Sequence, residues 1–240
     1  MKHIASTSNP LVKTLRRLAH PRKRDAQFLL EGKKLVSAAI ESKIDIEAIV
    51  VAASYRGDPP GGAVELDDSV FREVSTLDSP EGILAIASRP SHRVPRTGLI
   101  AVVAGIQDPG NLGALARVVE AAGADALVVL KGSTDPFGPK AVRGSMGSVV
   151  RIPVCDRVDV SELEGFRKIA LVPHGGSDYR ETDWSTPCAA LFGSESSGIS
   201  DELLSRCDVR ASVPMHGNVE SLNVATAAAL ALYEATRRDR

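Results

Sequence analysis

The amino-acid sequence predicts an α/β protein in which a small α/β domain precedes a larger domain built on a parallel sheet. From residue 99 onward, apolar stretches of strand length alternate with helical stretches, an order typical of a parallel sheet covered by helices. The stretch 88–98 combines prolines with basic residues and is typical of a linker. The length of 240 residues and the hydrophobic content of 43% are sufficient for two cores. We therefore divide the chain into a domain at 1–90, a linker at 91–98 and a domain at 99–240.

The first domain is predicted to mix helices and strands. Leu11, Leu15 and Leu18 recur at helical spacing and predict an amphipathic helix. The stretch 28–42 predicts a short strand, a turn at Gly32 and a second amphipathic helix, and 46–52 and 82–88 resemble strands. These elements form a small α/β module.

A basic segment distinguishes this first domain. It contains six basic residues and no acidic one, namely Lys13, Arg16, Arg17, Arg22, Lys23 and Arg24. Residues 1–97 carry 15 Lys and Arg against 12 Asp and Glu, whereas residues 98–240 carry 14 against 18. A polyanion would therefore prefer the first domain, although such a charge run can also be an ordinary solvated helix face.

The second domain supplies the alternation of strands and helices. Strands are predicted at 98–106, 126–130, 152–155, 169–173, 189–193 and 210–215. Helices are predicted at 112–124, 139–148, 161–167, 200–207 and 222–238. In such sheets ligands bind at the carboxyl ends of the strands, in the loops that lead into helices.

The first loop of interest is the stretch 104–118. Asp108, Pro109 and Gly110 predict a tight turn, and Asn111 is a candidate N-cap for the helix that follows. Arg117 lies within an otherwise apolar helix, where it is either a structural residue or needs an anion or a carboxylate as its partner.

The second loop follows a hydrophobic strand and has the sequence LFGSESSGIS, at 191–200. Its small residues allow backbone amides to approach a ligand, and Glu195 is its one charge, although a flexible turn with a solvated Glu is also possible. It lacks both the dinucleotide fingerprint and the Lys-Ser/Thr pair of a phosphate loop. An enzyme that uses a nicotinamide or a nucleoside triphosphate is therefore disfavoured.

The third loop opens the last helix, within 213–238. Ser221 is interpreted as a cap or a site residue, and Asn223 is unusual because it lies one position inside the predicted helix. Met215 and His216 precede them, and a histidine in such a loop is most commonly exposed to solvent.

The remaining composition indicates the cellular compartment. Cys155, Cys188 and Cys207 lack metal-ligand or CxxC spacing and are interpreted as reduced thiols. The first residues lack the apolar core of a signal peptide, and no apolar run approaches the roughly 20 residues of a membrane helix. We expect a cytoplasmic protein that binds neither a membrane nor a metal.

The three loops together resemble a known family. The motifs N-x-G-x-x-x-R at 111–117, FGSESSGIS at 192–200 and VPMHGNVESLNVA at 213–225 resemble those of the SpoU (TrmH-like) RNA 2'-O-ribose methyltransferases, members of the SPOUT superfamily. The resemblance extends from Leu99 to Arg240. The stretch NPLVKTLRRL…FLLEGKKLVSAA resembles the substrate-binding domain of the ribosomal-RNA branch of that family.

The resemblance implies a fold and a cofactor. Family members have a deep trefoil knot, which the strand and helix pattern alone does not suggest. By analogy, the knotted loops bind S-adenosylmethionine, and the residues that line its pocket are Gly193, Val213, Met215 and Leu222. The resemblance also implies a homodimer that packs through the knot region and the apolar last helix.

The resemblance further implies catalytic residues. Arg117 matches the arginine proposed to activate the ribose hydroxyl, and Glu195 would pair with it or position it. Asn111 would orient the ribose or a phosphate, and Ser221 and Asn223 would complete the hydrogen bonding around the target nucleotide. A guanidinium, with a pKa of about 12.5 or more, is a poor base, so a phosphate clamp that stabilises the developing alkoxide is physically easier. The basic segment would hold the RNA backbone.

Three alternatives remain at this point. The substrate is expected to be ribosomal RNA of the large subunit, and a transfer RNA is an alternative. A catalytically silent RNA-binding scaffold of the same fold is a second alternative, although it would not need all five polar motif residues. A doubly wound small-molecule enzyme is a third, and it does not account for the basic segment.

Overall fold

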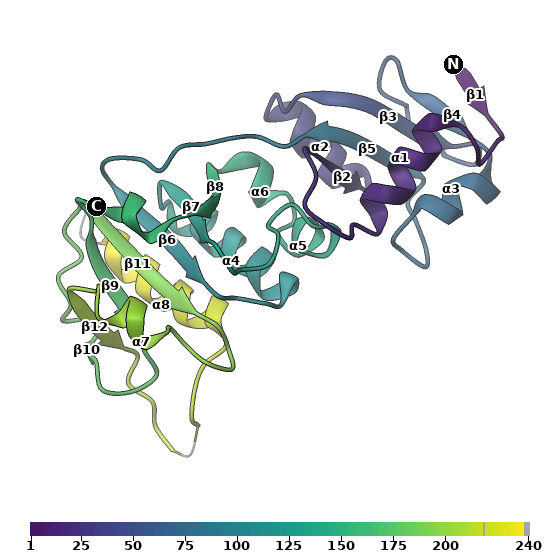
Figure 1. Cartoon of the computed structure of the whole chain (residues 1–240). Helices are drawn as coiled ribbons and strands as arrows, with labels where there is room; N and C mark the ends of the chain where they lie inside the picture. Colours follow the sequence, from purple (N-terminus) through teal and green to yellow (C-terminus); the bar gives the residue numbers. More distant parts are fainter. Residues whose placement is uncertain (218, 238–240) are drawn as a thin grey trace.

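The computed structural model describes residues 1–217 and 219–237 and contains two β-sheets toward opposite ends of an elongated molecule (Figure 1). The first sheet is mixed, with the order β1-β4-β3-β5-β2. Its strands are β1 (Lys2–Ile4), β2 (Gln27–Glu31), β3 (Ile46–Ala52), β4 (Val64–Leu66) and β5 (Ile83–Ser88). Strand β5 runs antiparallel to β2 and β3, and the other pairs are parallel.

Both faces of this first sheet are buried. Helices α1 (Pro10–Ala19) and α3 (Asp68–Val74) cover one face, where Leu84 and Ile86 of β5 belong to their hydrophobic cluster. The alternate residues of β5, such as Ala85, face α2 (Lys33–Glu41) and belong to a cluster that continues into the second sheet region. Because side chains alternate along a strand, one sheet thus joins two cores.

The second sheet consists of seven parallel strands in the order β10-β12-β9-β11-β6-β7-β8. They are β6 (Leu99–Ala104), β7 (Ala126–Leu130), β8 (Val154–Val158), β9 (Arg167–Leu171), β10 (Ser177–Asp178), β11 (Cys188–Gly193) and β12 (Val209–Ser212). All residues of β6 are buried, as expected for a strand covered on both faces. The predicted fold class is therefore confirmed.

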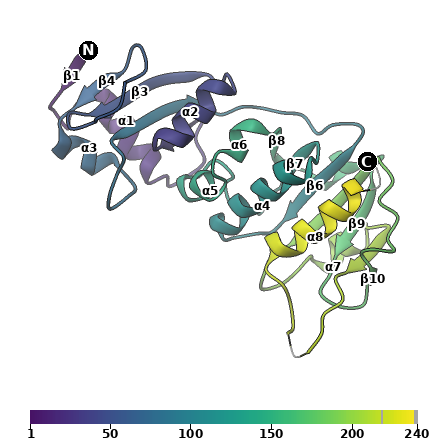
Figure 2. The same ribbon diagram turned by 180° about the vertical axis from the view of Figure 1, so that it is seen from behind.

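Helices α4 (Pro109–Ala122) and α8 (Val224–Arg237) lie side by side on one face of this sheet, as Figure 2 shows from behind. The remaining helices are α5 (Pro139–Gly144), α6 (Ser148–Arg151), the 3₁₀ turn η1 (Val160–Leu163) and α7 (Asp201–Leu204). The continuous helix predicted at 139–148 is wrong, since Met146 and Gly147 have φ of 52° and 93° and separate α5 from α6. Of the helix predicted at 161–167, only η1 forms.

The last helix also begins later than predicted, at Val224. Asn223 is therefore not inside the helix. It precedes the first turn, and its Oδ1 accepts a hydrogen bond from the backbone N–H of Ala225 at 2.9 Å. This geometry is that of an N-cap, which explains an asparagine at the start of an apolar helix.

The two sheet regions share one hydrophobic cluster. Phe28 of β2 packs against Phe137, which lies before α5, with ring centroids 5.1 Å apart. A methyl group on Gly147 would lie 3.2 Å from the Cβ of Ala38, so α2 and the α5–α6 turn are in close contact. The division of the chain at residues 91–98 stays a prediction, because packing here does not stop at the linker.

Candidate active site

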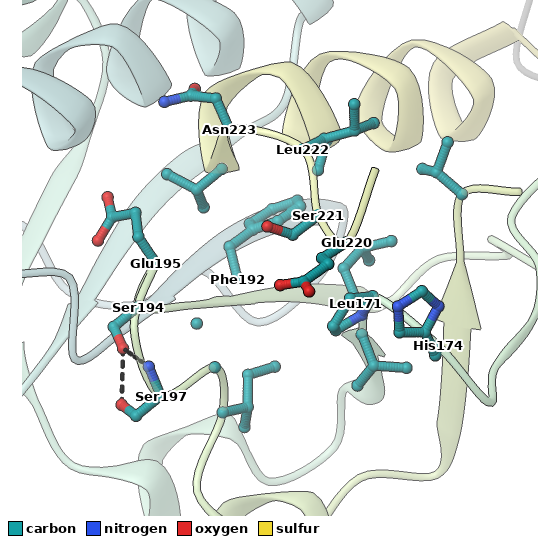
Figure 3. A pocket seen from close by; sticks show the side chains of 18 of the residues that line it. Leu171, His174, Phe192, Ser194, Glu195, Ser197, Glu220, Ser221, Leu222 and Asn223 are labelled. Carbon is teal, nitrogen blue, oxygen red and sulfur yellow. Dashed lines mark hydrogen bonds between the residues drawn. The ribbon is translucent and has the colours of Figure 1, made fainter. Parts of the chain in front are cut away.

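The second sheet region has a cavity of about 870 Å³ at the carboxyl ends of β9, β11 and β12 (Figure 3). The loops after these strands line it, through 172–174, 194–199, Val213, Met215 and 220–223. This volume is typical of a pocket for a small-molecule ligand. The position is the one expected for a ligand on a parallel sheet.

The cavity has apolar walls and a polar rim. Leu171, Phe192 and Ile199 contribute apolar surface, and Ser194, Ser197, Ser221 and His174 contribute polar groups. Gly193, Val213, Met215 and Leu222, which were predicted to line a cofactor pocket, all line this cavity. Leu222 keeps 37% of its surface exposed, so an apolar side chain remains available to a ligand.

The loop after β11 is a hydrogen-bonded turn. The backbone N–H groups of Ser194 and Gly198 each donate to the other residue's carbonyl oxygen, at 3.1 and 3.0 Å. The Ser194 hydroxyl also accepts from the Ser197 N–H at 3.1 Å. A Cβ on Gly193 would clash with the Gly198 backbone, so only glycine allows this turn to close. Glu195 is exposed at its tip.

Glu195 belongs to a cluster of three side chains from three distant segments, Asn111, Glu195 and Asn223, which we call the polar triad. Asn111 Nδ2 donates to Glu195 Oε1 at 2.5 Å, and Asn223 Nδ2 donates to Asn111 Oδ1 at 3.0 Å. An ionised carboxylate can only accept, so Asn111 must turn its NH₂ group toward Glu195 and its oxygen toward Asn223. By the same argument, Asn223 directs its NH₂ group toward Asn111 and its Oδ1 toward the backbone N–H of Ala225. The amide orientations are thus determined by the network.

The start of α4 holds Asn111 in place. Asp108, not Asn111 as predicted, is the N-cap, and its Oδ1 accepts from the Asn111 backbone N–H at 2.9 Å. Asn111 is thereby free to use its side chain in the triad. Lys140 of α5 donates to Asp108 Oδ2 at 2.9 Å, and this bond, followed by the Asn111 N–H, keeps the pKa of Asp108 below its ordinary value.

Gly113 brings α5 close to this turn. A Cβ at this position would lie 2.5 Å from the carbonyl oxygen of Ala141 and 2.7 Å from the Ser145 nitrogen. Only glycine therefore allows α4 and α5 to approach this closely. The glycine of the N-x-G motif serves helix packing beside the triad.

Arg117 does not face the triad. It lies six residues after Asn111, which places it about 120° away around the helix axis at 100° per residue. Its side chain is exposed and has no hydrogen-bond or ion-pair partner in the described part of the chain. Within one chain, Glu195 therefore binds Asn111 and not Arg117, so the expected pairing of Glu195 with Arg117 does not occur within a single subunit.

Figure 3 shows Ser221 and Glu220 next to each other in the cavity, on the loop that leads to Asn223. Sequence reasoning included Ser221 but missed Glu220, and it missed the whole loop after β9, with Pro173 and His174. The signal was present, because the segment IALVPHGG has an apolar strand that ends in proline, histidine and glycines. His216 is exposed and does not line the cavity.

The basic segment divides into two groups. Lys13, Arg22 and Lys23 are exposed and have no side-chain partner among residues 1–217 and 219–237, whereas Arg16 binds Glu73 at 2.6 Å and Arg17 pairs with Asp25. These five side chains and His20 line an open cavity of about 520 Å³.

Arg24 requires a correction. It was expected on the RNA-binding surface, but its guanidinium pairs with Asp156 and donates to the carbonyl oxygens of Ser133 and Thr134, at 2.6 and 3.1 Å. Only 22% of its side chain is exposed. Three of the five guanidinium N–H donors are thus used within the protein, which holds the Arg24 side chain against the second sheet region and away from the exposed basic surface.

Two further observations concern metals and membranes. The residues that the structure describes include no group of three or more His, Cys, Asp or Glu side chains arranged to hold a metal ion. None of the helices within 1–217 and 219–237 is long and apolar enough to cross a bilayer.

The fold and the site together define a class. The protein is an α/β protein with a ligand-sized cavity at the carboxyl edge of a parallel sheet and an amide–carboxylate triad formed by the same strand-end loops and the start of α4. Residues 98–233 match the SpoU rRNA Methylase family, and residues 9–85 match the MRM3-like substrate binding domain. The chain belongs to the SpoU rRNA methylase family, and the resemblance inferred from the three motifs is confirmed.

Similar proteins cover nearly the whole chain. RlmP, a 23S rRNA guanosine 2'-O-methyltransferase of Bacillus subtilis, is 34% identical over 97% of this chain and 98% of its own length. A 23S rRNA uridine 2'-O-methyltransferase of Streptomyces viridochromogenes is 34% identical over 90% of this chain and 85% of its own length. The crystal structure of an AdoMet-bound rRNA methyltransferase from Sinorhizobium meliloti superimposes with a TM-score of 0.87 at 29% identity, covering 99% of this chain and 98% of that one.

Proposed function

We propose that the protein transfers the methyl group of S-adenosylmethionine to a ribose 2'-hydroxyl of ribosomal RNA. The observation that carries this proposal is the polar triad beside the cavity, in a chain of the SpoU family. The match of residues 9–85 to a substrate binding domain and the names of the relatives support ribosomal RNA of the large subunit over transfer RNA.

The residues around the cavity fit S-adenosylmethionine. Apolar walls from Leu171, Phe192 and Ile199 suit an adenine ring, and the turn closed by Gly193 presents backbone groups and serine hydroxyls at the rim. Met215 and Leu222 would contribute further apolar contacts. When bound, the cofactor supplies a methyl group on a positively charged sulfur, so the protein has to position and activate only the acceptor.

The polar triad supports a role in holding the acceptor. Asn111 is fixed by bonds to Glu195 and Asn223, and each amide keeps one N–H beyond those used in the triad. Those donors can orient a ribose or phosphate oxygen, and the Ser221 hydroxyl can bind the same nucleotide from within the cavity. Preorganised donors of this kind stabilise charge that develops on an oxygen.

The position of Arg117 supports a dimeric site. Its side chain is exposed and directed away from the triad of its own chain. The neighbouring helix α8 exposes Leu230 to 37% and Tyr233 to 51%, which favours a second copy on this face. The protein then acts as a homodimer. In it, the partner's Arg117 binds a substrate phosphate and stabilises the developing alkoxide.

The trefoil knot implied by the family resemblance remains part of the proposed fold. Strand β12 lies between β9 and β10, and the loops after β9, β11 and β12 converge on one cavity, an arrangement that supports a chain threaded in this region. Placement in the cytoplasm remains a prediction from cysteine usage, and the proposed chemistry requires no metal.

The homodimer proposal is tested by mixing two inactive variants. Arg117→Ala and Asn111→Ala are each expected to lose turnover while binding S-adenosylmethionine within about threefold of the parent in calorimetry, since neither residue lines the cavity. If Arg117 acts across the interface, mixed dimers contain one complete site, and random mixing restores about a quarter of the parent activity.

The outcomes separate the alternatives. No recovery from mixed dimers would place Arg117 and Asn111 in the same subunit's site. Failure of the parent protein to bind S-adenosylmethionine would favour the silent scaffold. Methyl transfer to transfer RNA alone would retain the chemistry and reject ribosomal RNA.

A further inference from the structure

Arg24 and Arg89 lie next to each other at one edge of the first sheet. Arg24 lies in the loop before β2, and Arg89 directly follows β5, the antiparallel neighbour of β2. The Arg89 N–H donates to the carbonyl of Ala26 at 2.8 Å, which holds the two segments together. Both side chains therefore project from one edge of the first sheet region.

Both arginines bind aspartates of the second sheet region. Arg89 makes a two-pronged contact with Asp135, at 2.9 and 2.8 Å, and a bond to Asp156 Oδ2 at 3.2 Å. Arg24 pairs with the other oxygen of Asp156. We call Arg24, Arg89, Asp135 and Asp156 the interdomain clamp. Its four side chains are between 13% and 22% exposed.

The clamp has a second set of contacts that fix its geometry. The Arg89 guanidinium lies 5.0 Å from the centroid of the Phe137 ring, and Asp135 Oδ1 accepts from the Phe137 N–H at 2.9 Å. Phe137 in turn packs on Phe28 of β2. Two-pronged ion pairs specify orientation more strongly than apolar contacts do. The clamp therefore determines the orientation in which the two sheet regions pack around their shared apolar cluster.

A further contact joins the same two regions through helix α5. Arg143 of α5 donates to the Thr76 hydroxyl at 2.5 Å, and Thr76 donates to the buried carboxylate of Glu31 at 2.5 Å through the hydroxyl and 2.9 Å through the backbone N–H. Helix α5 also carries Lys140, which binds the Asp108 cap beside Asn111. The first sheet region is thus attached to the helix that supports the triad.

We propose that the interdomain clamp is a positioning device that selects the target nucleotide, by fixing the basic surface of Lys13, Arg22 and Lys23 at one distance and angle from the polar triad. Arg24 directly follows this surface in the chain, so its anchoring fixes the surface itself. The two 23S rRNA relatives act on a guanosine and on a uridine, which favours selection by position over selection by base. This inference rests on the proposed function.

The test uses the full chain with Asp135→Asn and Asp156→Asn combined, which retains side-chain size and leaves both arginines without a charged partner. The matched control is Asp183→Asn, which breaks the Arg167–Asp183 ion pair within the second sheet region. Arg89→Lys, which retains the charge and loses the two-pronged contact, is a milder second variant. Each is measured for binding of S-adenosylmethionine, for solution scattering, and for KM, kcat and mapped methylation positions on ribosomal RNA.

The clamp variant is expected to raise KM for RNA about 10-fold or more and to spread methylation over neighbouring nucleotides, with unchanged cofactor affinity. Arg89→Lys should show the same changes in weaker form, and the control should remain within about twofold of the parent. Scattering should show an expanded molecule for the clamp variant alone.

A clamp variant that methylates one position with the parent KM would overturn the proposal. So would a loss of cofactor affinity parallel to the loss of RNA affinity, since that result indicates general destabilisation. Scattering requires no activity. An expanded clamp variant beside an inactive parent would therefore reject the proposed function and retain the rigid attachment, whereas an unexpanded variant would reject the clamp.

Discussion

Two polar clusters connect distant parts of this chain, and they differ in what they leave free. The polar triad joins residues 111, 195 and 223 at the solvent edge of a cavity, and Glu195 uses one carboxylate oxygen for Asn111. The interdomain clamp is mostly buried, and both oxygens of Asp135 and of Asp156 are engaged by guanidinium groups. An exposed cluster with spare donors and acceptors can bind a substrate, whereas a mostly buried cluster whose carboxylate oxygens are all engaged fixes a structure.

The largest expected effect breaks the triad. Asn111→Asp keeps the shape of the side chain but replaces the NH₂ donor with a carboxylate that faces Glu195. We expect kcat to fall about 100-fold or more, because the preorganised amide is lost and two like charges meet. Steady-state kinetics on ribosomal RNA would measure this. An Asn111→Asp variant with parental kcat would show that the triad does not participate.

The next effect concerns the support of the triad. Gly113→Ala places a methyl group 2.5 Å from the Ala141 carbonyl, so α5 has to move away from α4. We expect the free energy of unfolding in urea to fall by about 1–3 kcal/mol. The control is Gly61→Ala, because nothing lies within 4 Å of its added methyl group. Gly165→Ala is not a suitable control, because Gly165 has a φ of 89°. Equal stability of the two variants would contradict close α4–α5 packing.

A smaller effect distinguishes free cations from paired ones. We replace Lys13, Arg22 or Lys23 singly with Gln. Each replacement should reduce the slope of log affinity for RNA against log salt concentration by about 0.7–0.9 for each lost phosphate contact. Arg16→Gln should reduce it less, because Arg16 already binds Glu73. Filter binding at several salt concentrations measures these slopes. A larger change for Arg16 than for the three free cations would reassign the RNA surface.

The smallest expected effect concerns two buried cysteines, which we expect not to react with an alkylating reagent in the folded protein. Burial raises the pKa of Cys155, which adjoins the clamp, to about 11, with Glu162 contributing, and burial raises that of Cys188 to about 12. Both thiols are therefore protonated at pH 8, and we expect iodoacetamide to modify them no faster than the protein unfolds globally. Mass spectrometry measures the rate. Rapid modification of Cys155 in the folded parent would mean that the clamp region opens.

The sequence was sufficient to predict the parallel sheet, because uninterrupted apolar strands alternate with helices from residue 99 onward. The family resemblance also indicated Gly193, Val213, Met215 and Leu222, and all four line one cavity, because strand-end loops meet at one edge of a parallel sheet. The sequence did not predict that Asn223 caps α8, since a cap and a first-turn residue differ by one or two positions along the chain.

Partner choice between distant side chains was beyond sequence reasoning. Arg24 and Asp156 are 132 residues apart and meet only because the two sheet regions share a cluster. A run of basic residues therefore indicates charge but does not tell which members pair within the protein. The pairing of Glu195 with Asn111, in place of Arg117, similarly depends on the helical phase of α4 relative to β11.

One measurement tests the central claim most directly. Purified protein is incubated with methyl-tritiated S-adenosylmethionine and unmodified 23S ribosomal RNA, and the RNA is then hydrolysed with alkali, beside Arg117→Ala as the inactive control. A methyl group on a ribose 2'-oxygen blocks alkaline cleavage, so the account predicts that the label is retained in a resistant dinucleotide and is absent from the variant. Label released entirely as mononucleotides, which indicates methylation of a base, or equal labelling by the variant, would contradict it.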